Sequence, residues 1–281
     1  MLSLQVASLA IPLFASEVEA QLTEALLAWV YSGWRDAMGP IRRVVLVAQT
    51  AADADSLADV FANVLEVYLA QRMALRNEGT PEHWTLMEAI GEEAIAERVE
   101  LEAWEPEYEM VQDIVQREAL QPNLKLQSVY RVQSRHLRQQ FAAHQTFLMR
   151  KHSAGDPTLE NTIERTLFHG TAESAAALIE KNGFDYRWCG KNATMYGQGP
   201  YFARDLKYSA QDLYSVRNAK GQKFIFIARV LVAKMCKGDA SMRHLAEPYD
   251  TSVDDVANPS IFVTYKDAQA CPDYLMIFST S

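Results

Sequence analysis

Four short segments in the C-terminal half constrain the fold of this 281-residue chain more than any other feature. Each mixes small residues with aromatic ones, and they occupy residues 167–171, 190–203, 208–214 and 259–263. A His-Gly pair or a glycine-rich turn arises by chance in many sequences, so one such segment alone would carry little weight. Four of them in a fixed order and spacing indicate that this part of the chain builds a single functional site.

The residues that follow these motifs show the pattern of an antiparallel sheet. Residues 224–232, 258–265 and 274–278 are rich in β-branched and aromatic residues, which is typical of strands, and turn residues separate them. Helices are needed to join and cover such a sheet. The pattern therefore predicts an α+β domain.

The four segments resemble the catalytic domain of the poly(ADP-ribose) polymerase family, in its mono-ADP-ribosylating branch, and the resemblance covers residues 104–281. It implies an ADP-ribosyltransferase fold with two antiparallel sheets around an NAD cleft. It also implies helices at residues 107–115, 133–150 and 172–182 and a first strand at 126–132. The implied substrate is NAD+, with no metal, and the implied acceptor is a protein, possibly the chain itself.

Gly170, Ser209 and Tyr214 match the family's nicotinamide site. A flat ring that carries an amide needs an aromatic face and paired polar groups. A residue without Cβ lets its backbone N–H and C=O approach a ligand closely, which suits Gly170 to the amide. The resemblance implies that the Ser209 hydroxyl assists and that Tyr214 stacks on the ring; a half-buried helical tyrosine is the alternative for Tyr214.

His169, Tyr201 and Ile261 occupy the positions of the family's His-Tyr-Glu triad. The resemblance implies that His169 bonds the adenosine ribose and that Tyr201 holds the nicotinamide ribose. Polymerising members carry glutamate where this chain has Ile261. A carboxylate there activates a ribose hydroxyl, and general-base help of that kind is worth about 10² to 10⁴ in rate. Because isoleucine has no base, we expect one ADP-ribose per acceptor site.

The same match implies further residues of the NAD+ site. They are Thr171, Tyr196, Phe202 and Ala203. The loop at residues 185–199 is expected to cover the nicotinamide side of the cleft, with Gly190, Gly197 and Gly199 as hinges.

Two other functions fit the same residues. A catalytically silent scaffold would keep the fold and bind NAD+ or ADP-ribose without turnover. An NAD+ hydrolase would pass the ribose to water. The chain retains His169, Gly170 and Tyr201, which favours activity over the silent scaffold.

The N-terminal residues 1–75 read as a separate small α/β segment. Apolar runs predict strands at 9–14 and 42–48, and helical periodicity predicts helices at 18–31 and 53–69. This alternation indicates a parallel layer. The segment resembles the C-terminal half of a macrodomain, but the loop at 12–16 has no glycine to hold a diphosphate. We therefore expect a scaffold, followed by an acidic helical linker at 76–103.

Composition limits the partners and the location. A formal net charge of −9 argues against binding nucleic acid, which needs clustered basic residues. The 3 cysteines show no close pair, which favours a reducing compartment. The apolar N-terminus lacks the basic residues of a secretion signal, and no apolar run is long enough to span a bilayer. We expect an intracellular protein, cytoplasmic or nuclear, with no membrane contact.

Overall fold

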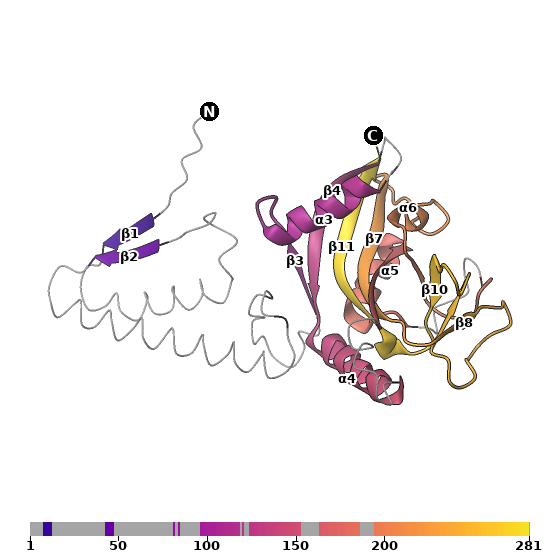
Figure 1. Cartoon of the computed structure of the whole chain (residues 1–281). Coiled ribbons are helices and arrows are strands. Elements are labelled where there is room, and N and C mark those ends of the chain that lie inside the picture. Colours follow the sequence, from indigo (N-terminus) through magenta and orange to yellow (C-terminus); the bar gives the residue numbers. More distant parts are fainter. Residues whose placement is uncertain are drawn as a thin grey trace. The chain divides into compact units, whose positions relative to one another are not determined.

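The computed structural model describes residues 8–12, 43–47, 81, 84, 96–118, 120, 124–152, 163–185 and 194–280. The chain divides into two compact units, Met1–Glu93 and Ala94–Ser281 (Figure 1). In the first unit, β1 (Ser8–Pro12) and β2 (Arg43–Val47) pair in parallel, which confirms the parallel layer for these strands. The two helices predicted around them lie outside the described residues.

The second unit is built on a sheet of nine strands, which Figure 1 shows with helices packed around it. The sheet order is β3-β4-β11-β7-β5-β6-β10-β9-β8. The bounds are β3 (Glu97–Glu100), β4 (Leu124–Gln133), β5 (Glu164–Thr171), β6 (Tyr201–Ala203), β7 (Gln222–Leu231), β8 (Met235–Lys237), β9 (Thr251–Val253), β10 (Ile261–Val263) and β11 (Ala270–Thr280). The helices are α3 (Pro106–Arg117), α4 (Arg135–His152), α5 (Glu173–Asn182), α6 (Leu206–Ser209) and the short η3 (Asp267–Gln269).

The α+β class is confirmed, with one difference in strand direction. Neighbouring strands are antiparallel except β8 and β9, which are parallel, so the expectation of purely antiparallel strands is wrong at this pair. A single residue pair, Phe168 with Ala203, joins β5 to β6. This narrow joint divides the sheet into β3-β4-β11-β7-β5 on one side and β6-β10-β9-β8 on the other. The arrangement as two separate sheets stays a prediction.

Strand β7 shows how the sequence builds a core on both faces of the sheet. Side chains of a strand alternate between faces, and nearly all of β7 is buried. Phe224 and Phe226 pack into one apolar cluster with Ala176 of α5, whereas Ile225 and Ile227 pack into another that includes residues of α3. A continuous apolar run is therefore the mark of a central strand covered by helices on both sides.

Strand β3 corrects the prediction of a helical linker at residues 76–103. Residues 97–100 form an edge strand that pairs with β4. Arg98 donates from Nε and Nη2 to the Glu180 carboxylate of α5, both at 2.8 Å, and its guanidinium lies 5.4 Å from the Tyr130 ring centroid. These long-range contacts outweigh the helix propensity of the glutamates. The second unit therefore begins before residue 104.

Helix α3 is fastened to the sheet by Glu107. Its carboxylate accepts hydrogen bonds from Arg131 of β4 and, at 2.8 Å, from the Tyr274 hydroxyl of β11. Arg131 is only 1% exposed, so its charge needs a partner inside the protein. Burial and the carboxylate raise the pKa of Tyr274, which keeps its hydroxyl a donor.

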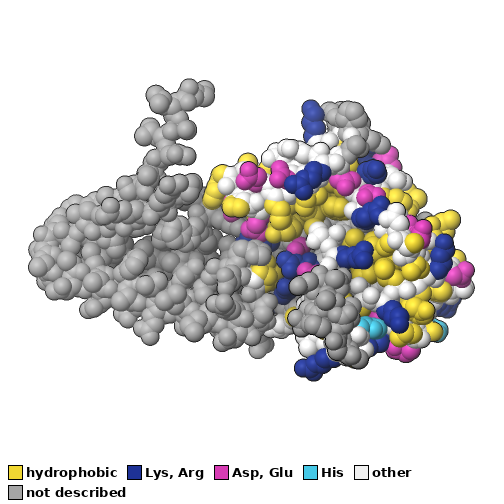
Figure 2. All heavy atoms as spheres, in the orientation of Figure 1, with side chains coloured by type: hydrophobic (Ala, Val, Ile, Leu, Met, Phe, Trp, Pro, Cys, Tyr) yellow, Lys and Arg dark blue, Asp and Glu magenta, His cyan; other side chains and the backbone are white. Residues whose placement is uncertain are grey.

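The described surface is mixed in character. On the face shown in Figure 2, basic and acidic side chains are interspersed over the described residues. Within those residues no helix is long and apolar enough to cross a membrane.

Replacing Glu107 with alanine is expected to lower the free energy of unfolding by about 3 kcal/mol. The change leaves the buried Arg131 guanidinium without the Glu107 carboxylate and removes the acceptor of Tyr274. Glu109→Ala, which removes an exposed glutamate of the same helix, should change stability by less than about 0.5 kcal/mol. Urea unfolding of the full chain measures both, and equal losses would contradict the prediction.

Candidate active site

Three adjacent strands bring the predicted triad positions together. Ala203 of β6 pairs with Phe168 of β5 on one side and with Ile261 of β10 on the other. His169 directly follows Phe168, and Tyr201 is the first residue of β6. Residues 32 and 60 positions apart along the chain thus become neighbours in the sheet, since 201 − 169 = 32 and 261 − 201 = 60.

A hydrogen bond to a backbone carbonyl and contacts with two aromatic rings hold the His169 ring in one orientation. Its Nδ1 lies 2.8 Å from the Tyr201 carbonyl oxygen, which can only accept, so Nδ1 carries the proton and Nε2 remains an acceptor. The ring also packs edge-on against Phe184 at 5.1 Å and against Phe202 at 5.6 Å between centroids. Burial lowers the pKa of His169, so the neutral ring offers an acceptor at neutral pH.

Gly170 lies where β5 comes closest to α6. A Cβ at this position would lie 2.2 Å from the Ser209 carbonyl oxygen and 3.2 Å from the Tyr214 carbonyl carbon, so a side chain would not fit without a backbone shift. The glycine therefore brings the strand against the two residues that were predicted to share its ligand.

The backbone of Gly170 faces the open side of β5. The Val232 N–H donates to the Ile163 carbonyl at 2.6 Å, and the antiparallel alternation from that pair turns the N–H and C=O of Gly170 away from β7. Since Phe168 is the one residue of β5 that pairs with β6 in the described part of the chain, the edge beyond that pair has no strand partner among the described residues. A donor and an acceptor side by side are the groups that an amide needs.

Ser209 and Thr171 frame this edge. Ser209 is 3% exposed, and its Oγ lies 3.1 Å from the Phe168 carbonyl oxygen, to which it donates. A hydroxyl can rotate, so the same oxygen can also serve a ligand. Thr171 is 7% exposed and pairs with Phe224 of β7.

Tyr214 lies in a turn that contacts with strand β7 hold in place. The Ser215 hydroxyl donates to the Phe224 carbonyl at 3.1 Å and accepts the Phe224 N–H at 3.0 Å. Lys223, 2% exposed, forms an ion pair with Asp212 at 2.7 Å. The bond from Lys223 holds the pKa of the Asp212 carboxyl below its usual range. The turn is therefore fixed while the Tyr214 ring remains partly exposed.

The Tyr201 hydroxyl ties β6 to the turn before it. It accepts the Tyr196 N–H and donates to the Gly197 carbonyl, both at 2.9 Å. Burial raises the pKa of Tyr201. A Cβ on Gly197, whose φ is +134°, would lie 1.8 Å from the Tyr265 hydroxyl, and one on Gly199 would lie 2.0 Å from a carbonyl oxygen. Both glycines are therefore positions of tight packing, and their role as hinges stays a prediction.

Two residues from the far end of the domain support this turn. The Ser252 hydroxyl of β9 donates to the Tyr196 carbonyl at 2.6 Å and lies 2.8 Å from the Tyr265 hydroxyl. Ser252 is fully buried and Tyr265 is half-buried, so these bonds are shielded from water. Tyr196 is thus held through both its N–H and its carbonyl.

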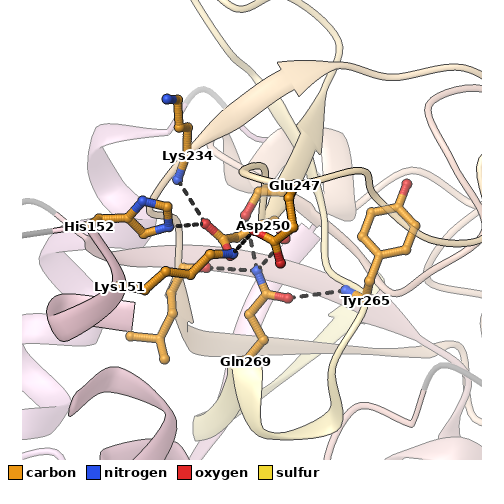
Figure 3. A network of polar contacts seen from close by, with 9 residues as sticks. Lys151, His152, Lys234, Glu247, Asp250, Tyr265 and Gln269 are labelled. Atoms are coloured by element: carbon orange, nitrogen blue, oxygen red, sulfur yellow. Dashed lines mark hydrogen bonds and ion pairs between the residues drawn. The ribbon is translucent and has the colours of Figure 1, made fainter. Parts of the chain in front are cut away.

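The support continues to the end of α4, as Figure 3 shows. The Gln269 amide accepts the Tyr265 N–H at 3.1 Å and donates to the Asp250 carbonyl at 2.9 Å. The Asp250 carboxylate bonds Lys151 at 2.8 Å and Nε2 of His152 at 2.6 Å. A continuous series of polar contacts therefore runs from helix α4 to the Tyr201 hydroxyl.

Ile261 is 4% exposed and brings no polar atom to the third triad position. The neighbouring carboxylate, Asp254, accepts the N–H of Ser260 at 2.9 Å, the N–H of Ile261 at 3.0 Å and the Ser260 hydroxyl. Burial alone would raise the pKa of Asp254, but these bonds outweigh it and hold the pKa below its usual range. The Asp254 carboxylate is therefore used to hold the turn before β10.

The other predicted residues take supporting places. Phe202 is 1% exposed in the core and packs against His169, and Ala203 is 2% exposed in the strand row. Their contact with NAD+, like that of Tyr196, stays a prediction. Residues 186–193 of the loop lie outside the described residues, and so does Gly190. No group of three or more metal-ligating side chains occurs among the described residues.

Sequence reasoning did not find several residues that shape the site. They are Tyr208, Lys223, Ser252, Tyr265 and Gln269. Tyr208 stands next to Ser209 inside a recognised motif, so a test of each aromatic residue there would have found it. The others carry no motif and reach the site only through strand pairing.

Comparison with known proteins identifies the family of this chain. Residues 105–253 match the family described as the poly(ADP-ribose) polymerase catalytic domain, which is more than half of the 281 residues. The chain therefore belongs to the poly(ADP-ribose) polymerase catalytic domain family.

Several curated relatives are named mono-ADP-ribosyltransferases. The chain is 35% identical over 190 residues to protein mono-ADP-ribosyltransferase PARP10 of Mus musculus, covering 63% of this chain and 19% of the relative. It is 31% identical over 216 residues to PARP14 of Homo sapiens, covering 74% and 11%, and 41% identical over 125 residues to PARP12 of Homo sapiens, covering 42% and 17%. The chain thus spans less than a fifth of the length of each of these relatives.

Replacing Ser252 with alanine is expected to lower the free energy of unfolding by about 1 to 3 kcal/mol. The change leaves the Tyr196 carbonyl and the Tyr265 hydroxyl without this partner in a partly buried setting. Ser174→Ala, at an exposed position of α5, is the matched control and should have little effect. Thermal and urea unfolding measure the difference, and equal behaviour of the two variants would contradict the support role.

His169 is expected to make stability depend on pH. Its folded pKa lies below the ordinary value of 6.5, so the unfolded chain binds the proton more readily. The contribution is fully present above pH 6.5 and is lost as the pH falls through the folded pKa. Between pH 7.5 and 5.5 the wild type should lose more stability than His169→Asn. An equal loss of stability in the wild type and in His169→Asn would show that the pKa of His169 is the same in the folded and unfolded states, which would contradict the prediction.

Proposed function

We propose that this chain transfers one ADP-ribose from NAD+ to a side chain of a protein acceptor and releases nicotinamide. The observation that carries this proposal is the apolar, buried Ile261 on β10, the strand that pairs with β6, on which Tyr201 lies. The adjacent Asp254 cannot replace a catalytic glutamate, since three hydrogen bonds engage it. A site with a donor-binding edge but no free base fits single transfer better than polymer growth.

The donor end follows from the exposed edge of β5. In this proposal the N–H and C=O of Gly170 bond the nicotinamide amide, the Ser209 hydroxyl assists, and Tyr214 stacks on the ring. Nε2 of His169 accepts a hydrogen bond from a ribose hydroxyl, which its neutral state and fixed tautomer support. These contacts hold the ribose at C1′ in an orientation that exposes one face to the acceptor.

The chemistry then needs little from the protein beyond orientation. The bond between C1′ and the nicotinamide nitrogen breaks, and nicotinamide leaves with the bonding electrons while C1′ gains oxocarbenium character. An acceptor carboxylate attacks C1′ without losing a proton, because it is already ionised. Glu and Asp acceptors therefore suit a site that lacks its own base; acceptor mapping that finds only Arg or Ser would contradict this part of the proposal.

The remaining assignments are part of the same proposal. Residues 104–281 form the catalytic domain, to which β3 adds an edge strand, and the protein acceptors include the chain itself. Residues 1–75 act as a scaffold that binds no ADP-ribose. The reaction takes place inside the cell and requires no metal.

Incubation of the full chain with labelled NAD+ tests the transfer. The wild type should label protein in discrete steps and release nicotinamide, whereas His169→Ala should lower labelling by about 100-fold or more, since it removes the ribose acceptor and the packing of the site. His244→Ala, which removes an exposed histidine, is the control and should label normally.

Each of three other outcomes would indicate a different function for this chain. NAD+ binding with neither label nor nicotinamide release would indicate a silent scaffold. Nicotinamide release without protein label would indicate a hydrolase. A ladder of long polymer from the wild type would refute the interpretation of Ile261.

A further inference from the structure

Two tyrosines of the third motif form a pair, and the proposed reaction gives a role to Tyr214 but none to Tyr208. The rings of Tyr208 and Tyr214 are stacked, with centroids 4.8 Å apart and planes 22° from parallel. Their hydroxyl oxygens lie 2.6 Å apart, which is hydrogen-bond distance. Tyr214 therefore contacts Tyr208 through its ring and through its hydroxyl.

The two tyrosines lie in segments that differ in burial. Tyr208 belongs to α6, whose other residues include the fully buried Leu206 and the buried Ser209. Tyr214 lies in the following turn, where Leu213 is 54% exposed and Val216 is 52% exposed. The helix can thus fix the side chain of the turn through the stack and the hydroxyl bond.

The hydroxyl of Tyr208 is fixed as a hydrogen-bond donor by its surroundings. Burial, the bond to Tyr214 and the nearby hydroxyls of Tyr196 and Tyr201 raise the pKa of Tyr208. Its hydroxyl therefore remains protonated at neutral pH and can donate to Tyr214.

We propose that Tyr208 is a positioning residue for nicotinamide, which holds the Tyr214 ring in the plane and rotation at which it stacks on the nicotinamide ring. This inference rests on the proposed function, because it assigns Tyr214 to the nicotinamide end of NAD+. Stacking depends on ring offset and tilt, so a tyrosine that is fixed before binding holds the ligand more tightly than one that must be ordered by it.

Titration of the full chain with two ligands tests the proposal. Nicotinamide carries the ring that Tyr214 would stack on, whereas ADP-ribose lacks it. Tyr208→Phe keeps the stack but loses the hydroxyl bond, and should weaken nicotinamide binding by about 3- to 10-fold. Tyr208→Leu loses both and should weaken it further. ADP-ribose affinity should stay within about twofold in both variants, which also shows that the site is folded.

A double-mutant cycle separates positioning from independent contacts. If the hydroxyl pair is what matters, Tyr214→Phe should weaken nicotinamide as much as Tyr208→Phe, and the double variant no further. Tyr249→Phe makes the same change at an exposed position and should bind both ligands as the wild type does.

Three results would overturn the inference. They are unchanged nicotinamide affinity in Tyr208→Phe, an equal loss of ADP-ribose affinity, and additive losses in the double variant. A wild type that binds neither ligand would instead refute the proposed function, and the inference would fall with it.

Discussion

The site depends on one residue pair, the contact between Phe168 of β5 and Ala203 of β6. It is the sole ladder pair between the two strands in the described part of the chain. A longer ladder would have used the backbone groups of Gly170 for strand pairing. A missing one would have left His169 and Tyr201 unconnected. The short junction therefore keeps the triad strands together while it leaves a donor and an acceptor open for an amide.

The aromatic hydroxyls of the domain serve a second purpose besides ligand contact. Tyr201 and Tyr265 use theirs to hold the turn at residues 194–200 in place, and Gly197 permits the close approach. Buried polar groups of this kind are costly unless each is paired, so the network fixes one geometry. The geometry of the site thus depends on hydrogen bonds within the protein in addition to the contacts predicted with NAD+.

Much of this architecture was accessible from the sequence. The apolar run at 224–232 lies within β7 except for its last residue, and the run at 274–278 lies within β11. The residues expected to form the triad lie on neighbouring strands. What the sequence could not predict depends on contacts between distant segments. Residues 97–100 carry glutamates that favour a helix, but the edge of β4 makes them a strand. The glycines at 197 and 199 look like hinges locally and are tight contacts only because Tyr265 and the end of β10 pack on them.

Strand β3 has a practical consequence for anyone who works with the catalytic unit alone. Motif matching places the start of the domain near residue 104. A chain cut there would lose β3, which pairs with one edge of β4, and the Arg98–Glu180 ion pair. The uncovered strand edge would present a row of unpaired backbone groups, which is the usual starting point of strand-to-strand aggregation. A soluble and faithful catalytic fragment should therefore keep the residues from 94 onward.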